Sequence, residues 1–184
     1  MCRSQSEDAA RGGNPPRQEQ QFRQTLEGSD DDRRRDDGRW MHSALEAARE
    51  AAEAGDVPVG AVLVHGGREL ARCGNRREQD QDPTAHAEIV ALRAAAAALG
   101  NHRLDEATLY VTLEPCPMCL GAILEARVAR LVFGAYDERA GAAGSAIDLT
   151  ATLPSTYRLE VNGGLLREEC AALLAEFFAE RRED

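Results

Sequence analysis

The chain has 184 residues and 43% apolar residues, which suits one globular domain with a single core. No apolar stretch is long enough to span a bilayer, so we expect no membrane partner. The formal net charge of −10 argues against broad nucleic-acid affinity, and the five cysteines, an odd number, indicate free thiols in a reducing cytoplasm.

Residues 1–38 differ in composition from the rest of the chain. They contain a Gly-Asn-Pro-Pro stretch and a mixed charge run from Asp30 to Asp37, with Phe22 and Leu26 as nearly the only large apolar side chains. Such a segment cannot bury a core, and its many acidic residues do not fit a transit peptide. We predict a disordered N-terminal tail over 1–38 and a folded domain over 39–184.

The folded part is expected to begin with a helix from Trp40, because apolar residues recur at helical spacing until Gly55. The apolar run 57–65 predicts a strand covered on both faces, and Gly66-Gly67 would turn it into a second strand over 69–74. The loop 75–85 then leads into a helix that ends near Gly100, with Asp82-Pro83-Thr84 as its start signal.

A strand over 107–113 is predicted next, followed by a helix whose first position suits Pro117. A strand over 131–133, a loop containing 141–145, and a weak strand over 158–161 come after it. The final helix would turn its apolar side chains toward the core: Leu166, Cys170, Leu173, Leu174, Phe177 and Phe178. The alternation of strands and helices predicts a three-layer α/β/α fold with a central mixed sheet of about five strands.

Two short motifs carry the candidate chemistry. His86, Cys116 and Cys119 could fill three corners of a tetrahedral zinc site, and a fourth corner left for water is typical of a catalytic zinc. Glu88 follows His86 by two residues and could move protons between water and substrate. Because residues i and i+2 point to nearly opposite sides of a regular helix, the motif fits only at the first turn of a helix.

Each motif alone has another interpretation. A single C-x-x-C in an intracellular protein could be a redox pair, and a lone histidine on an apolar helix is more often a core residue than a ligand. Together, however, H-x-E and P-C-x-x-C form the known signature of the zinc deaminases. The combination favours a zinc hydrolase.

From Trp40 onward the sequence resembles the bacterial tRNA-specific adenosine deaminases, which have the cytidine-deaminase-like fold. The zinc signature fits the whole superfamily, and the flanking blocks indicate the tRNA branch. These blocks are Val57 to Val62, Gly74 to Arg76, Asp82 to Ile89, Leu109 to Cys116, Val132 to Ala135, Gly141 to Ser145 and Glu169 to Leu174.

The resemblance implies that His86, Cys116 and Cys119 hold Zn²⁺ and that Glu88 is the catalytic proton shuttle. Zinc-bound hydroxide would attack C6 of an adenine flipped into the pocket, and loss of ammonia would give inosine. The implied substrate is the wobble adenosine in the anticodon stem-loop of a tRNA, in this family an arginine tRNA. The family members are homodimers.

The resemblance also implies substrate contacts by Asn75, Ala87 and Asp137. Asn75 could instead be a turn residue after a strand, and Asp137 could be a loop charge. At the position before Asp137 the family often has a basic residue, whereas this chain has Tyr136.

The charge of the predicted domain conflicts with an RNA substrate. Residues 39–184 contain 15 arginines and 23 acidic residues, a net charge of −8. RNA binding would therefore need a local basic surface, with Arg76, Arg77, Arg103 and Arg139 as loop candidates. The alternatives are a deaminase of a free base or nucleoside, such as guanine or cytosine, and a non-catalytic zinc-stabilised subunit. Glu88 argues against the latter, because a structural zinc site has no use for this carboxylate.

Overall fold

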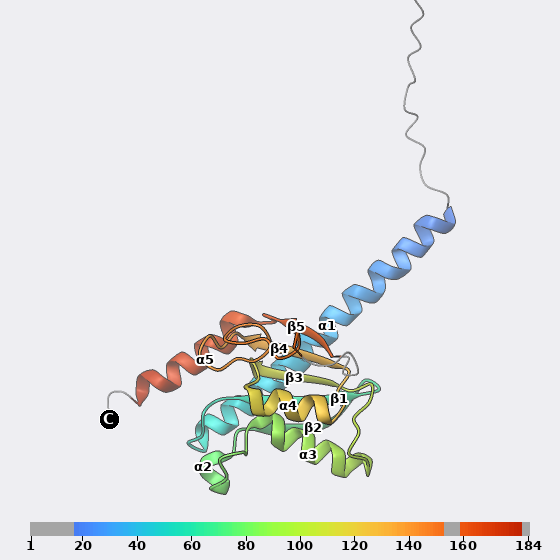
Figure 1. Ribbon diagram of the computed structural model, residues 1–184. Coiled ribbons are helices and arrows are strands. Elements are labelled where there is room, and N and C mark those ends of the chain that lie inside the picture. Colours follow the sequence, from blue (N-terminus) through green and yellow to red (C-terminus); the bar gives the residue numbers. More distant parts are fainter. Residues whose placement is uncertain (1–16, 153–158, 182–184) are drawn as a thin grey trace, which may run out of the picture. The chain divides into compact units, whose positions relative to one another are not determined.

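Figure 1 shows the protein as a computed structural model, which describes residues 17–152 and 159–181, with side chains from Arg33 onward. The chain divides into two compact units, 1–35 and 36–184. Residues 1–16 of the predicted tail and Arg158 of the predicted weak strand lie outside the described residues.

The second unit is built on a five-stranded mixed sheet with the order β2-β1-β3-β4-β5. The strands are β1 (Gly60–His65), β2 (Arg68–Gly74), β3 (Thr108–Leu113), β4 (Arg130–Ala135) and β5 (Glu160–Gly163). β1 runs antiparallel to β2 and β3, whereas β3, β4 and β5 are parallel to one another. The predicted mixed sheet is confirmed.

Helices α3 (Ala87–Leu99) and α4 (Pro117–Glu125) cover one face of this sheet (Figure 1). Their small and branched side chains pack on alternate residues of the strands, as the period of two in a strand requires. This core includes Ala87, Ala91, Leu92, Leu120 and Ile123 from the helices and Leu63, Leu109, Val111, Leu131 and Phe133 from the strands.

The opposite face is covered by the part of α1 (Arg17–Glu53) that belongs to the second unit and by α5 (Arg167–Glu180). Trp40, Met41 and Leu45 of α1 and Cys170 of α5 pack against Val62, Val64, Tyr110 and Val132 of the strands. Gly60 allows α1 to approach β1 closely, because a Cβ atom there would overlap the carbonyl oxygen of Ala44. The three-layer α/β/α arrangement is therefore confirmed.

Helix α1 begins at Arg17 and includes residues 17–38, whose composition predicts disorder. Asp37 lies in the second compact unit and is buried. Its carboxylate accepts hydrogen bonds from the Tyr110 hydroxyl (2.7 Å) and from the Arg130 guanidinium (2.7 and 2.8 Å). A domain beginning at Arg39 would lack this carboxylate. That residues 1–38 form a separate tail stays a prediction.

Other differences are local. A short helix, α2 (Arg77–Asp80), lies within the predicted loop 75–85, and β1 begins at Gly60 and not at Val57. The prediction that Phe178 faces the core is wrong, because its residue is 45% exposed whereas Phe177 is buried. Successive residues on a helix are about 100° apart, so two adjacent phenylalanines cannot both face the sheet.

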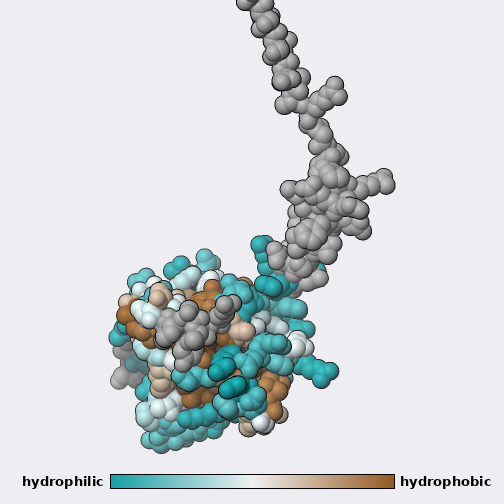
Figure 2. Space-filling view, turned by 45° about the vertical axis from the view of Figure 1, so that its right-hand side comes forward, coloured by the Kyte–Doolittle hydropathy of each residue, from teal (hydrophilic) through white to brown (hydrophobic). Residues whose placement is uncertain are grey.

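The surface in Figure 2 is largely hydrophilic, with smaller apolar areas between the charged side chains. Among the residues that the structure describes, no helix has both the length and the apolar character needed to cross a bilayer.

Candidate active site

Both predicted motifs lie at the N-termini of helices. His86 is the residue before α3, and Cys116 is the residue before α4, with Pro117 in the first turn. Glu88 and Cys119 follow within the first turns of the same helices. This arrangement is the one that the spacing of His86 and Glu88 requires. It also directs the partial positive charge of two helix ends toward one point, which favours thiolates there.

The three predicted ligands converge. The ligand atoms of His86, Cys116 and Cys119 all lie within 4.8 Å of one another. His86 Nδ1 is 3.8 Å from Cys116 Sγ and 3.5 Å from Cys119 Sγ. Ordinary Zn–N and Zn–S bond lengths place nitrogen and sulfur about 3.6 Å apart across a tetrahedron. The donor set and its spacing therefore fit zinc.

The two thiols differ in acidity and share one hydrogen bond. Hydrogen bonds from Cys119 and from His86 hold the pKa of Cys116 down to about 4, so Cys116 is a thiolate at neutral pH. The same shared hydrogen bond and burial raise the pKa of Cys119 far above its ordinary value. Binding of a metal releases such protons, because the ligands must be deprotonated.

Glu88 is enclosed beside the ligand cluster. Glu88 is only 3% exposed to solvent, and its carboxyl group lies within hydrogen-bonding contact of Cys119. Burial raises the pKa of Glu88 above its ordinary value. A raised pKa makes the carboxylate a better proton acceptor, which suits a general acid–base.

Asn75 and Ala87, two predicted substrate contacts, bind each other. Asn75 is buried at the end of β2, and its Oδ1 accepts a hydrogen bond from the Ala87 N–H at 2.9 Å. This bond fixes the orientation of the amide, and Nδ2 makes no hydrogen bond with any described residue. The Ala87 N–H is already occupied, so the available donor at this position is Asn75 Nδ2.

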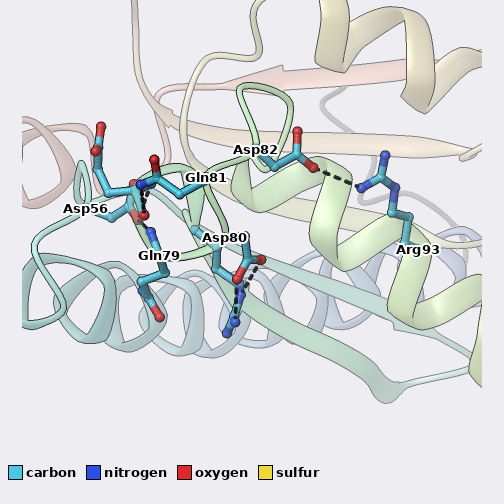
Figure 3. A network of polar contacts seen from close by, with 8 residues as sticks. Asp56, Gln79, Asp80, Gln81, Asp82 and Arg93 are labelled. Atoms are coloured by element: carbon cyan, nitrogen blue, oxygen red, sulfur yellow. Dashed lines mark hydrogen bonds and ion pairs between the residues drawn. The ribbon is translucent and has the colours of Figure 1, made fainter.

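Polar contacts hold the segment that leads to His86 (Figure 3). Asp56 Oδ2 accepts hydrogen bonds from the backbone N–H groups of Glu78 and Gln79, so it holds the start of α2. Asp82 Oδ1 accepts from both the N–H and the hydroxyl of Thr84, and Asp82 Oδ2 lies 3.7 Å from Arg93 of α3. The turn that delivers His86 is thereby tied to its own helix.

Asp137, the third predicted substrate contact, supports its own turn. Its Oδ1 accepts hydrogen bonds from the backbone N–H groups of Arg139 (2.9 Å) and Ala140 (3.2 Å). The side chain is half-buried at the end of β4. Asp137 thus has the structural role in its loop that the sequence left open. A substrate contact would use its other carboxylate oxygen, Oδ2.

Glu114 is a site residue that sequence reasoning missed. It is buried two residues before Cys116, and its carboxylate accepts backbone hydrogen bonds from Asp137 (3.1 Å), Ala143 (2.9 Å) and Ser145 (3.1 Å). The Ser145 hydroxyl also donates to it. Gly141 is required nearby, because a Cβ atom there would overlap this carboxylate. A carboxylate at the end of a buried strand was the available sequence signal.

Comparison with known proteins agrees with this geometry. The sequence model of the MafB19-like deaminase family matches residues 35–182, so the chain belongs to this family of deaminases. A tRNA-specific adenosine deaminase of Haemophilus influenzae is 50% identical over 149 residues, which cover 80% of this chain and 86% of that protein. The predicted resemblance to bacterial tRNA-specific adenosine deaminases is confirmed.

Solved structures of two kinds of deaminase are similar to this chain. One comes from work on A-to-I editing by tRNA:A34 deaminases at the wobble position; it is 46% identical with a TM-score of 0.69, over 74% of this chain and 99% of that chain. The other is guanine deaminase from Nitrosomonas europaea, 29% identical with a TM-score of 0.68, over 77% of this chain and 84% of that chain. These structures confirm the cytidine-deaminase-like fold.

Proposed function

We propose that this protein is a zinc-dependent tRNA deaminase that converts the wobble adenosine of an anticodon, that of an arginine tRNA, to inosine. The observation that carries the proposal is the convergence of His86, Cys116 and Cys119 beside the buried carboxyl group of Glu88. The similarity to tRNA-specific adenosine deaminases supports the choice of substrate. The tRNA substrate and the free thiolate ligands favour a location in the cytoplasm.

The residues of the chain have separate tasks in this reaction. His86, Cys116 and Cys119 would hold zinc, which when bound supplies the Lewis acidity that makes water nucleophilic near neutral pH. Glu88 accepts the proton that water loses as its oxygen bonds to C6, and returns it to the departing amino group. Asn75 Nδ2 is the donor placed to orient the nucleoside, next to the start of α3.

The candidate arginines for RNA binding are not equivalent. Arg76 makes two hydrogen bonds to Asp80, at 2.8 and 2.9 Å, so its charge is largely neutralised. Arg77, Arg103 and Arg139 form no ion pair with any residue that the structure describes. Arg77 lies close enough to His86 to lower its pKa, although hydrogen bonding to Cys116 raises that pKa overall. Arg77 is therefore the best candidate near the metal-binding motif.

The test is a parallel assay of the full-length protein with zinc. An RNA stem-loop with adenosine at the wobble position should be converted to inosine, whereas free adenosine, guanine and cytosine should be nearly inert. The purified protein should contain about one zinc per chain. Cys116→Ser should lose metal and activity, and Cys73→Ser, which alters a half-buried thiol on β2, should keep both. Full activity of metal-free protein would contradict the proposal.

A deaminase of a free base is the second candidate, because the fold is similar to guanine deaminase at a TM-score of 0.68. Efficient turnover of guanine without any reaction on the stem-loop would select this alternative. The zinc ligands and Glu88 would keep the same roles, since the metal chemistry is common to both reactions.

We also propose a homodimer, as the resemblance implies. A hollow of about 540 Å³ lies between α3 and α4, lined by apolar side chains that include Ile89, Leu92 and Leu104. Met118 contributes to this hollow and is 38% exposed, although it lies between the two cysteines of the metal-binding motif. A second copy covering this surface would bury it. Light scattering should show a dimer, and Met118→Glu should shift the protein toward the monomer.

A further inference from the structure

Tyr136 is an exposed aromatic residue that its neighbours hold in place. Tyr136 is 42% exposed to solvent. Its ring meets the ring of Phe133 at 87°, with centroids 5.1 Å apart, and the backbone of Gly164 lies against it, since a Cβ atom there would be 3.4 Å from the ring. A large side chain that is both exposed and fixed loses little conformational entropy when it binds a partner.

Arg167 comes from a distant part of the chain to lie on this ring. It is the first residue of α5, and its guanidinium carbon lies 5.0 Å from the centroid of Tyr136. Among the described residues Arg167 forms no ion pair, so its positive charge is not neutralised by a carboxylate contact. Contact with the ring orients the guanidinium plane while leaving its donors available.

The Tyr136–Arg167 pair lies beside the loop that Glu114 holds. Tyr136 directly precedes Asp137, and both side chains of the pair line a hollow of about 420 Å³ together with Glu138 and Ser145. The Ser145 hydroxyl donates a hydrogen bond to Glu114, which lies two residues before the ligand Cys116. The hollow is thus joined to the metal-binding motif through Ser145 and Glu114.

We propose that the Tyr136–Arg167 pair binds a nucleotide that neighbours the target adenosine in the RNA. Arg167 binds the phosphate of this nucleotide, and the ring of Tyr136 contacts its unstacked base. This inference rests on the proposed tRNA substrate and names a subsite for it.

The chemistry of the pair suits single-stranded RNA. Unpaired bases in RNA loops stack on aromatic rings and on guanidinium planes, and arginine donors match phosphate oxygens. Glu138 faces the same hollow and adds a negative charge, so the subsite is not a general anion site. A nucleotide, which offers a phosphate and a π face together, matches the pair better than a free anion does.

The subsite is tested by measuring how tightly the anticodon stem-loop binds to full-length protein that carries Glu88→Gln, a change that slows turnover. Arg167→Ala should weaken binding roughly five- to tenfold at 50 mM salt and lower the slope of log K against log salt by about 0.7 to 1. Tyr136→Ala should weaken binding roughly tenfold, whereas Tyr136→Phe should bind normally because the ring remains. In the active enzyme, Arg167→Ala should raise KM with kcat nearly unchanged.

Arg181→Ala is the matched control, because Arg181 lies over Phe177, 4.0 Å from its centroid, at the other end of the same helix. It should leave RNA affinity and the salt slope unchanged. Melting temperatures of all variants exclude unfolding as the cause of weaker binding. If the stem-loop is converted to inosine but Arg167→Ala and Tyr136→Ala bind it like Arg181→Ala, the subsite is wrong and the proposed function stands. If the parent protein neither binds nor converts the stem-loop, both fail.

Discussion

At the scale of single residues, the site depends on the N-termini of α3 and α4, which bring the three ligand residues together. His86 and Glu88 are two positions apart and would diverge within a helix, but the chain enters α3 at His86 and only then becomes helical. Cys116 enters α4 in the same way. The helix start signals around Asp82 and Pro117 made this placement predictable from sequence. What the spacing could not predict is the burial that raises the pKa of Glu88.

Glu88→Gln is expected to separate catalysis from metal binding. The amide has nearly the same shape but cannot accept and return a proton, so turnover should fall by about 10²- to 10⁴-fold. Zinc content and melting temperature should stay close to the parent values, because Glu88 is not needed as a ligand. Inosine formation, measured with excess enzyme over stem-loop, gives the rate. Near-normal turnover would show that Glu88 moves no proton in the reaction.

At the scale of elements, Glu114 connects the end of β3 to the loop after β4. This single carboxylate receives hydrogen bonds from the backbone of Asp137, Ala143 and Ser145 and from the Ser145 hydroxyl. The loop therefore takes its shape from a residue that precedes it by more than twenty positions. Asp137 lies in this loop, and loop residues Glu138 and Ser145 line the hollow beside Tyr136. The position of the loop therefore determines how a substrate would be held.

Glu114→Gln should loosen this loop. The amide replaces one accepting oxygen by an NH₂ group that faces backbone donors, which should cost about 1–3 kcal/mol of unfolding free energy. KM for the stem-loop should rise more than kcat falls, since the zinc ligands are untouched. Urea denaturation and steady-state kinetics would measure the two effects. Glu138→Gln, on the exposed side of the same loop, should leave the stability unchanged; equal stabilities of the two variants would remove Glu114 from this role.

Helix α1 is joined to the sheet by a buried ion pair. Asp37 binds both Tyr110 of β3 and Arg130 of β4, and the Arg130 side chain is only 15% exposed. Burial and the hydrogen bond to Asp37 raise the pKa of Tyr110 well above its ordinary value, so the hydroxyl stays a donor. Removing Asp37 would take the acceptor away from the Tyr110 hydroxyl and from both terminal nitrogens of Arg130, although Arg130 Nε would keep its hydrogen bond to Asn162.

Truncation should therefore depend on whether Asp37 is kept. A protein that begins at Asp36 is expected to melt like the full chain, and one that begins at Arg39 should melt several degrees lower because Arg130 and Tyr110 lose their acceptor. Asp37→Asn in the full chain should reproduce part of the loss. Calorimetry of the three proteins measures this. Identical melting temperatures would mean that the ion pair contributes nothing to stability.

At the scale of the whole molecule, an acidic protein must bind RNA through few contacts. The net charge is −10, and several arginines are already engaged with carboxylates, such as Arg72, Arg76 and Arg130. Long-range attraction to RNA is therefore weak, and recognition must come from the loop nucleotides themselves. This favours reading of splayed bases and 2′-hydroxyls over binding along a duplex.

The salt dependence of binding should show this small number of contacts. For two to four phosphates, the slope of log K against log salt should have a magnitude of about 1.4 to 2.8. A DNA stem-loop of the same sequence should be a far poorer substrate, because it lacks the 2′-hydroxyls. Fluorescence anisotropy over a salt series, together with the inosine assay, would test both points. A steep slope with equal use of DNA would indicate non-specific electrostatic binding.

The layers, the mixed sheet and the convergence of the metal-binding motif could be predicted from the sequence, because they follow from local patterns of apolar residues and helix caps. Contacts between residues far apart in the chain could not be predicted in this way. Asp37 was assigned to the tail, since nothing near it indicates that Arg130 will pair with it. Glu114 stands out in the sequence only as part of a family block, and the prediction for Phe178 overlooks that Phe177 already occupies the direction of the core.

The ion pair between Asp37 and Arg130 also affects the order in which the protein can assemble during synthesis. The two residues are 93 positions apart, so α1 and the hairpin of β1 and β2 are complete long before β4 is made. Until then the Arg130 guanidinium that binds the Asp37 carboxylate in the folded sheet is absent, and close docking of that end of α1 would bury the carboxylate without it. The ribosome-bound chain should therefore keep this end of α1 hydrated, and the first helix should be among the last elements to lock into place.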